Sequence, residues 1–395
     1  MSDSFSVVSS QSWFSRIIES IKSVLFGLVM FAVSFPILYW NEGRAVRTAR
    51  SLTEGLGAVV SVPADNVDAS KEGKLVHVAG AVKTAQPIAD DELPVNATAV
   101  KLIRNVEMYQ WTEHESHETR KKTGGGTETI TTYSYNKEWA KGRVDSSSFK
   151  KSEGHENPAE PPYASKTFTA DSVKVGAFMM SPEQVSKLTD SVAMPVDAST
   201  AAQLPAAVKD KMRVQDGKFY MGQDAASPQI GDVRISYNVV KPDSVSLVGV
   251  QKASTFVPFQ AQAGDAILLV ETGMHTAQEM FKLAQDRNAM LTWILRGVGF
   301  FIMFLGIVMT FKPIAVVADV VPLFGTALSA GIGAFAFLGA AVLSFATIAV
   351  AWVVVRPVLG ISLLVVAVGA LVWLLKIGRS RKAAKATAAA VPARA

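Results

Sequence analysis

Long uncharged, apolar runs lie at the two ends of the chain, and a polar middle separates them. Residues 23–40 form the first run, which is bounded by Lys22 and Glu42. A helix needs ~20 apolar residues to cross ~30 Å of hydrocarbon. We therefore expect a transmembrane helix over 23–40 that follows a cytoplasmic N-terminus, residues 1–22. A cleavable signal peptide is the alternative, but no small-residue cleavage site follows the run.

Three more transmembrane helices are predicted near the C-terminus. The first covers 289–311 and contains one charge, Arg296. The next uncharged stretch is too long for one upright helix and barely long enough for two. We therefore expect an interfacial or re-entrant segment over 312–325 and one long, tilted helix over 326–355. The last predicted helix covers 358–375, after a tight polar turn.

Four crossings place both termini on one side of the membrane. The basic tail, residues 376–395, assigns that side to the cytoplasm by the positive-inside tendency. The middle, residues 41–288, is then exoplasmic, which means periplasmic or lumenal. Arg44, Arg47 and Arg50 follow the first helix on the outer side and oppose this orientation, although large domains translocate with little regard to charge. A hairpin of two short helices in the longest apolar run would reverse the orientation.

The polar middle has the pattern of a β-rich domain. Strands are predicted where apolar positions alternate and β-branched or aromatic residues gather. These segments are 74–82, 99–111, 127–135, 232–240, 244–250 and 266–271. A helix over 275–288 runs without a breaker into the second apolar run. The predicted fold class is an α+β membrane protein, with one N-terminal and three C-terminal transmembrane helices flanking the β-rich exoplasmic domain.

The domain is predicted to begin with an amphipathic juxtamembrane helix over 42–56. On this helix Arg44, Arg47 and Arg50 lie beside an apolar face, at a spacing of three residues. One interpretation is that the helix lies in the headgroup layer and binds anionic lipid. The other is a solvated, charged helix face.

Composition removes several function classes. The chain has no cysteine, which excludes thiolate catalysis, disulfides and cysteine-ligated zinc. The net charge of +5 is carried largely by the tail, where no aromatic residues interleave with the basic ones. This pattern favours membrane lipids over nucleic acid as the partner.

Few residues have the pattern of a chemical site. His114 and His117, among glutamates, form the one cluster that resembles a metal site, but residues three apart on a strand point to opposite faces. Asp145, Ser146 and His155 have the residue types of a hydrolytic triad without a nucleophile elbow. We predict no catalytic, cofactor-binding or metal site.

Small residues in the C-terminal helices indicate close helix packing. Gly325, Gly331, Gly333 and Gly339 allow backbones to approach each other, either inside one chain or between chains. Ionisable residues are absent from mid-membrane depth in the predicted helices, which argues against a coupled transporter. We therefore expect these glycines to contribute to helix packing or to a homo-oligomer.

Short motifs spread along the chain carry a family resemblance. They include Trp40-Asn41-Glu42-Gly43-Arg44, Tyr109-Gln110-Trp111, Tyr133-Ser134-Tyr135-Asn136, Gly154-His155, Gly231-Asp232-Val233-Arg234, Thr292-Trp293, Ala318-Asp319 and Arg356-Pro357. With these motifs in this order, the chain resembles the transmembrane protein 43 family, also called LUMA. The resemblance implies a multi-pass protein with a lumenal or exoplasmic domain. It also implies a self-associating scaffold, whose animal members bind membrane proteins such as emerin, and lamins.

The leading hypothesis from the sequence is a non-enzymatic, multi-pass membrane scaffold that self-associates and organises other membrane proteins or the membrane itself. An oligomeric pore or channel is the alternative, and an exoplasmic hydrolase is a third. The lack of cysteine and the alanine-rich tail fit a bacterial member of the family. We expect a bacterial inner membrane in that case, and the endoplasmic reticulum or inner nuclear membrane in a eukaryote.

Overall fold

The computed structural model describes residues 3–358 and 360–362. The chain divides into two compact units. The β unit comprises Met1–Ser12, Arg50–Lys122 and Gly126–Asp286, and the helical unit comprises Trp13–Ala49, Thr123–Gly125 and Arg287–Ala395. Each unit has its own buried core, and each is described by itself.

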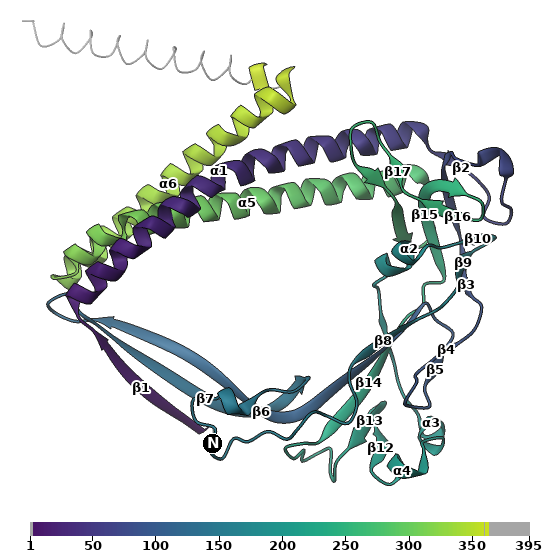
Figure 1. Cartoon of the computed structure of the whole chain (residues 1–395), viewed down its shortest axis with the longest axis horizontal. Coiled ribbons are helices and arrows are strands. Elements are labelled where there is room, and N and C mark those ends of the chain that lie inside the picture. The colour runs from purple at the N-terminus through teal and green to yellow at the C-terminus, as the bar shows by residue number, and fades with distance from the viewer. Residues whose placement is uncertain (1–2, 359, 363–395) are drawn as a thin grey trace, which may run out of the picture. The chain divides into compact units, whose positions relative to one another are not determined.

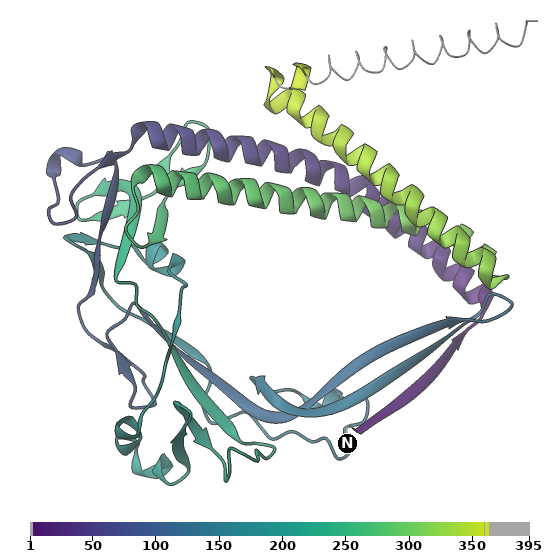
Figure 2. The same cartoon turned by 180° about the vertical axis from the view of Figure 1, so that it is seen from behind.

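Three long helices supply most of the helical unit: α1 (Trp13–Ala58), α5 (Ala277–Ala318) and α6 (Pro322–Val355), although residues 50–58 of α1 and 277–286 of α5 belong to the β unit. All three are long and apolar enough to cross a membrane, so the described residues contain three candidate spans and do not confirm the predicted four. Within this unit α1 and α5 run side by side (Figures 1 and 2). The fourth predicted helix, 358–375, lies largely outside the described residues.

The helix boundaries differ from those expected. There is no break after residue 40, because α1 continues to Ala58 and includes the segment expected as a separate amphipathic helix. The expected re-entrant segment, 312–325, is instead the end of α5, a short turn and the start of α6. Pro313 lies inside α5 because a proline removes only one backbone donor and helix packing compensates for it. The longest apolar run is one helix.

Glycines on α1 and α5 allow these two helices to pack closely. A Cβ atom on Gly27 would lie 2.8 Å from the carbonyl oxygen of Gly306, and one on Gly306 would lie 2.7 Å from the backbone nitrogen of Phe31. A Cβ atom on Gly299 would lie 2.5 Å from Cδ2 of Leu38. Any larger side chain at these positions forces the two helices apart.

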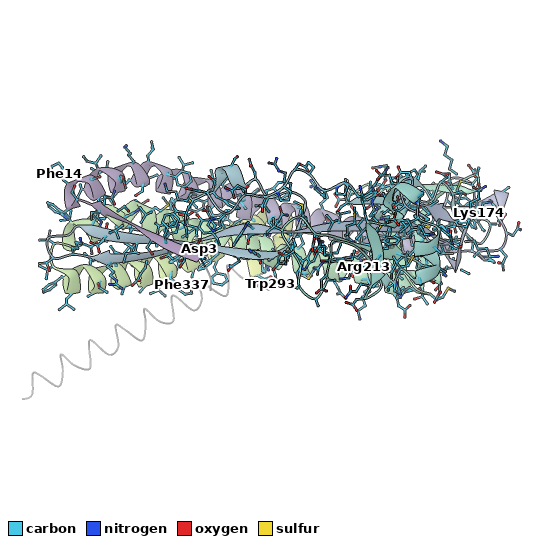
Figure 3. All side chains as sticks on the ribbon, turned by 90° about the horizontal axis from the view of Figure 1, so that it is seen from below. Asp3, Phe14, Lys174, Arg213, Trp293 and Phe337 are labelled. Carbon is cyan, nitrogen blue, oxygen red and sulfur yellow. The ribbon has the colours of Figure 1, made fainter. Side chains whose placement is uncertain are left out.

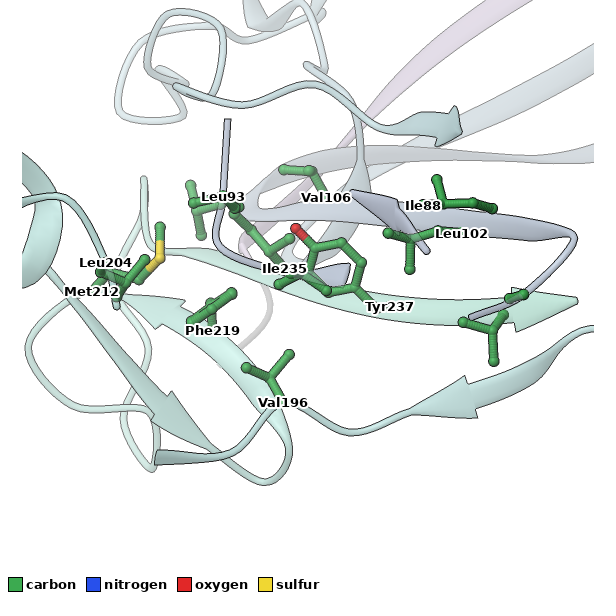
Figure 4. Close-up of a cluster of buried hydrophobic side chains, with 14 of the residues drawn as sticks. Ile88, Leu93, Leu102, Val106, Val196, Leu204, Met212, Phe219, Ile235 and Tyr237 are labelled. Carbon is green, nitrogen blue, oxygen red and sulfur yellow. The ribbon is translucent and has the colours of Figure 1, made fainter. Parts of the chain in front are cut away.

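Two sheets form most of the β unit. The eight-stranded sheet has the order β1-β7-β6-β14-β13-β12, with β11 paired to β14 and β8 paired to β6. Its strands are β1 (Asp3–Gln11), β6 (Lys101–Lys121), β7 (Thr127–Lys141), β8 (Lys166–Thr169), β11 (Val192–Met194), β12 (Met212–Gln215), β13 (Lys218–Met221) and β14 (Val233–Val240). Its core, with Leu102, Phe219 and Ile235 at 0% exposure, is drawn in Figure 4. The predicted strand alternation is clearest in β6 and β14.

The seven-stranded sheet has the order β10-β9-β3-β15-β16, with β19 paired to β15 and β2 paired to β3. Its strands are β2 (Val60–Ser61), β3 (Leu75–Thr84), β9 (Val173–Val175), β10 (Phe178–Met179), β15 (Ser244–Lys252), β16 (Thr255–Val257) and β19 (Leu269–Thr272). The pairs β4 (Ile88–Ala89) with β5 (Asn96–Ala97) and β17 (Phe259–Gln260) with β18 (Ala266–Ile267) are separate. Short helices α2 (Pro182–Lys187), α3 (Ala198–Ala202) and α4 (Ala206–Lys209) lie in the connections.

Strand β1 was not expected. All nine of its residues pair antiparallel with β7, from Asp3 opposite Tyr135 to Gln11 opposite Thr127. The N-terminus, residues 1–22, was predicted to be cytoplasmic and separated from the β-rich domain by a membrane crossing. Residues 3–11 are instead part of a sheet of that domain. The strand gave no clear signal because most of its side chains are exposed, and it is held mainly by backbone hydrogen bonds.

Candidate functional site

Polar side chains from all three long helices gather near one end of the apolar part of the helical unit. We call this group the Glu42 network. Its members are Asn41, Glu42 and Arg44 on α1, Asn288, Thr292 and Arg296 on α5, and Trp352 on α6. Several of these residues belong to the motifs that carry the family resemblance, although they are far apart in the sequence.

Glu42 is the centre of the network and is 1% exposed. Arg296 donates from Nε to Oε1 at 2.6 Å and from Nη2 to Oε2 at 2.9 Å, which is the two-pronged geometry that suits a carboxylate. The indole nitrogen of Trp352 donates to Oε2 at 2.7 Å. The guanidinium of Arg296 also lies over the ring of Trp293, 4.6 Å from its centre. A buried charge is tolerated only with this degree of pairing.

A second set of bonds in the network joins α1 to α5. Arg44 donates to Oδ1 of Asn288 at 2.9 Å and to Oγ1 of Thr292 at 3.0 Å. The side-chain amide of Asn41 donates to the carbonyl oxygen of Thr292 at 3.0 Å, and that of Asn288 donates to the carbonyl oxygen of Ala45 at 2.9 Å. These contacts fix the relative position of two helices at a point where apolar packing alone would allow sliding.

The three arginines predicted to bind lipid headgroups therefore have different surroundings. Arg44 is partly buried and bonded to α5, so protein groups occupy its guanidinium. Arg47 and Arg50 are exposed on α1. A lipid contact stays a prediction for these two residues.

The opposite end of the helical unit is fastened by a second buried ion pair. Nη2 of Arg16, in the first turns of α1, lies 2.6 Å from Oδ2 of Asp319 after α5, and Asp319 is 2% exposed. Arg16 also donates to the carbonyl oxygen of Gly125. The indole nitrogen of Trp13 donates to the carbonyl oxygen of Val316 at 2.9 Å. Both ends of the long helices are thus held by charge-assisted hydrogen bonds.

The glycines predicted for helix packing divide into two groups. A Cβ atom on Gly325 would lie 2.0 Å from Oδ1 of Asp319, and one on Gly339 would lie 3.6 Å from Cδ1 of Ile307, so both contact their own chain. Gly331 and Gly333 have no atom of the described chain within 4 Å of a Cβ position, neighbouring helix backbone aside. These two positions on α6 are open, and they lie on different sides of the helix because residues two apart do not face each other.

A buried charge cluster lies in the β unit. Arg104 on β6 is 1% exposed; it donates from Nη1 to Oδ1 of Asp90 at 2.6 Å and forms an ion pair with Glu92. The hydroxyl of Tyr237 donates to the other oxygen of Asp90 at 2.7 Å. Burial and the bond to this carboxylate raise the pKa of Tyr237, so it stays a neutral donor. The side chain of Arg104 borders an open groove of about 950 Å³ beside Tyr163.

Neighbouring carboxylates in the same region are close enough together to hold a cation. Oxygen atoms of Asp90, Asp91 and Glu92 lie within 4.8 Å of one another. Arg104 engages the first and third of these residues, however, and Lys166 pairs with the second. A metal ion would have to displace both cations, because each of the three carboxylates already has a protein partner.

The residues with triad chemistry are not arranged as a triad. His155 is 2% exposed and stacks on Tyr135 with ring centres 3.9 Å apart. Its Nδ1 is 3.0 Å from the carbonyl oxygen of Lys151, and its Nε2 is 3.2 Å from Asp3 on β1. Ser146 instead accepts a hydrogen bond from a backbone nitrogen, that of Asn157. This arrangement packs the loop after β7 against the sheet.

His114 and His117 lie on the outer part of β6, with side chains 55% and 58% exposed. Each is near one glutamate, Glu138 or Glu115, at 3.4 and 3.5 Å. Tyr135 on β7, which pairs with Glu113 of β6, is buried, and its hydroxyl donates to the Glu113 carboxylate at 2.6 Å. Burial, the larger cause, and that bond raise the pKa of Tyr135 to about 12.

Sequence reasoning missed the Glu42 network as a site. It identified Arg296 only as the one charge in the predicted helix 289–311 and assigned it no partner. A usable signal was present, because each pair of opposite charges lies at corresponding ends of two apolar runs: Glu42 with Arg296, and Arg16 with Asp319. Solitary charges at matching depths of two helices are expected to pair.

Comparison with known proteins connects these residues to one family. The sequence profile described as Transmembrane protein 43 matches residues 108–357. The chain is 35% identical to Transmembrane protein 43 of Mus musculus over 353 residues, which cover 87% of this chain and 86% of the mouse protein. It is 35% identical to the Homo sapiens protein, covering 88% of each chain. It is 31% identical to the Drosophila melanogaster homolog, covering 88% of this chain and 93% of that protein. No solved structure matches the chain.

Proposed function

Because the chain belongs to the transmembrane protein 43 family, we propose that it is a non-enzymatic membrane scaffold that self-associates and organises other membrane proteins or the membrane itself. The observation that carries this proposal is the open surface of α6 around Gly331. Gly27, Gly299 and Gly306 serve the packing of α1 against α5, whereas a Cβ atom on Gly331 would meet no atom of the described chain within 4 Å, neighbouring helix backbone aside.

An open glycine on a membrane helix is suited to a second helix. Small residues let two backbones approach closely, and in lipid this packing replaces the hydrophobic effect as the source of association. Phe335 and Leu338 follow Gly331 at helical spacing on the same side of α6, and they are 58% and 65% exposed. A neighbouring copy of α6 would find a gap at Gly331 and apolar side chains beside it. The proposed partners are thus a second copy, other membrane proteins and membrane lipids.

Crosslinking in native membranes tests this proposal. The variant Gly331→Leu fills the open position, and we expect the crosslinked dimer fraction to fall at least about fivefold, which corresponds to ~1 kcal/mol of association energy. Val354→Ala is the matched control, because it changes an exposed apolar side chain on a different side of the same helix. If dimers persist equally in all three proteins, or the unmodified protein is monomeric, the proposal fails.

The pore alternative loses its motivation. It rested on an apolar run that fits neither one nor two crossings, and that run is a single helix, Pro322–Val355. The hydrolase alternative rested on His155 and the pair His114 and His117, which are engaged in packing or exposed on a strand. We therefore propose the scaffold alone, in a cellular membrane whose identity depends on the organism.

A further inference from the structure

Both ends of α1 join the same β unit through the chain. Ser12 alone separates α1 from β1, and β1 is paired along its whole length with β7. At its other end α1 is followed after one residue by β2, which pairs with β3. A complete membrane crossing by α1 would place β1 and β7 on opposite faces of the membrane. That crossing is incompatible with the observed sheet.

The hairpin tip between β6 and β7 gives a second, independent constraint. The tip, Thr123–Gly125, belongs to the helical unit. The backbone nitrogen of Gly124 donates to the carbonyl oxygen of Val320 at 3.3 Å, and Arg16 donates to the carbonyl oxygen of Gly125. The connection between α5 and α6 therefore lies beside a turn that two strands of the β unit lead to. The start of α5 also follows the β unit directly, after β19.

The strands that lead to this tip are too polar to pass through lipid. The outer part of β6, residues 113–121, contains three glutamates and two histidines, followed by Arg120 and Lys121, and its side chains are largely exposed. Charged side chains and open sheet edges do not occur in contact with hydrocarbon. The tip and the sheet are consequently in the same aqueous compartment.

We infer that the helical unit inserts into the membrane from one face, so that α1 and α5 enter and leave through the face on which the β unit and residues 3–12 lie. The occupant of their exposed apolar surface is lipid. Large apolar side chains project there from all three helices, as Phe14, Trp293 and Phe337 illustrate in Figure 3. These three residues are 69%, 67% and 54% exposed.

One-sided insertion also accounts for the charges that flank α1. Arg16 and Lys22 precede its apolar part, and Arg44, Arg47 and Arg50 follow it. A helix that crosses the membrane is expected to be more basic on one side. A helix whose two ends meet the same headgroup layer is expected to be basic at both. The inference does not depend on the proposed scaffold function.

The absence of cysteine makes a clean labelling experiment possible. Single cysteines are introduced in the full-length protein by Ser10→Cys in β1, Thr123→Cys at the tip and Lys209→Cys in α4, all at exposed positions. A membrane-impermeant maleimide is then added to sealed vesicles, before and after permeabilisation. We expect all three cysteines to react from the same face. Reaction of Ser10→Cys and Lys209→Cys from opposite faces overturns the inference.

A paired cysteine experiment checks the strand contact itself in the membrane. The hydroxyl oxygens of Ser6 and Thr132 lie 2.8 Å apart, so Ser6→Cys with Thr132→Cys should form a disulfide under mild oxidation. Ser6→Cys with Thr131→Cys is the matched control, because adjacent strand residues point to opposite faces. We expect at least about tenfold more disulfide in the first pair. Equal, low yields in both pairs would show that β1 is not paired with β7.

Discussion

An arginine pairs with a buried carboxylate in each of the two units, but the surroundings of the two pairs differ. In the helical unit Glu42 is 1% exposed and also accepts from the indole of Trp352, whereas its partner Arg296 is partly exposed. In the β unit Arg104 and Asp90 border an open groove, and the second acidic partner, Glu92, is half exposed. When Arg104 is lost, Glu92 is open to water and Asp90 keeps the hydroxyl of Tyr237, whereas loss of Glu42 removes the carboxylate that Arg296 binds. The same residue types are thus expected to tolerate change differently.

The largest effect is expected from Glu42→Leu. The change leaves Arg296 charged, largely buried and without its carboxylate, which costs about 3–5 kcal/mol of unfolding free energy. The unfolding free energy is measured by denaturation in mixed detergent micelles. The double variant Glu42→Leu with Arg296→Leu removes both charges, and we expect it to recover more than half of the loss. A single variant as stable as the unmodified protein would show that the pair is not buried.

Arg104→Met is expected to have a smaller effect, about 2 kcal/mol, because Glu92 is half exposed to water and Asp90 keeps the hydroxyl of Tyr237 as a donor. The unfolding free energy is again measured in mixed detergent micelles, with a signal that reports on the β unit. Lys166→Met is the control, since it removes an exposed cation that pairs with Asp91. A larger loss for Arg104→Met than for Glu42→Leu would reverse the comparison between the two units.

Trp352→Phe tests one hydrogen bond of the Glu42 network while keeping an aromatic side chain. Loss of the indole donor removes one charge-assisted bond to Glu42, and we expect a loss of about 1–2 kcal/mol. Phe345→Leu on the same helix is an exposed control, 70% exposed, and should change stability little. An equal effect of both changes would show that the indole bond contributes nothing.

The smallest predicted effect is a pH dependence confined to the β unit. Burial lowers the pKa of His77 on β3 from 6.5, although its bond to the carbonyl oxygen of His275 opposes this. As the pH falls, this histidine is therefore protonated in the unfolded chain before it is protonated in the folded one. Stability is fully present above pH 6.5 and declines as the pH falls below it. His77→Gln should flatten this part of the stability curve. An unchanged slope between pH 7 and 5 would assign it to other groups.

The sequence predicted those features that depend on local pattern. Apolar runs located the three long helices, and alternation located the central strands such as β6 and β14. The sequence analysis was wrong where contacts between residues far apart in the chain determine the structure. β1 has exposed side chains and exists because β7 offers an unpaired edge, and α1 continues past residue 40 because its polar residues bond to α5.

The candidate site was harder to predict than the fold. Glu42 and Arg296 were both visible as charges beside apolar runs, but only the packing of α1 on α5 shows that they meet. That packing depends on Gly27, Gly299 and Gly306, whereas the predicted packing glycines were all on α6. Of those four, two contact their own chain and two are open. Sequence position alone cannot distinguish these two roles, because both require a small residue.

A double-mutant cycle across the Glu42 network tests most directly whether paired charges hold the long helices together. The cycle uses Glu42→Gln, Arg296→Gln and the combined variant, with unfolding free energy measured in mixed micelles. Buried, bonded partners are expected to show a coupling energy of about 2 kcal/mol or more. Additive losses, with a coupling below about 0.5 kcal/mol, would contradict the account.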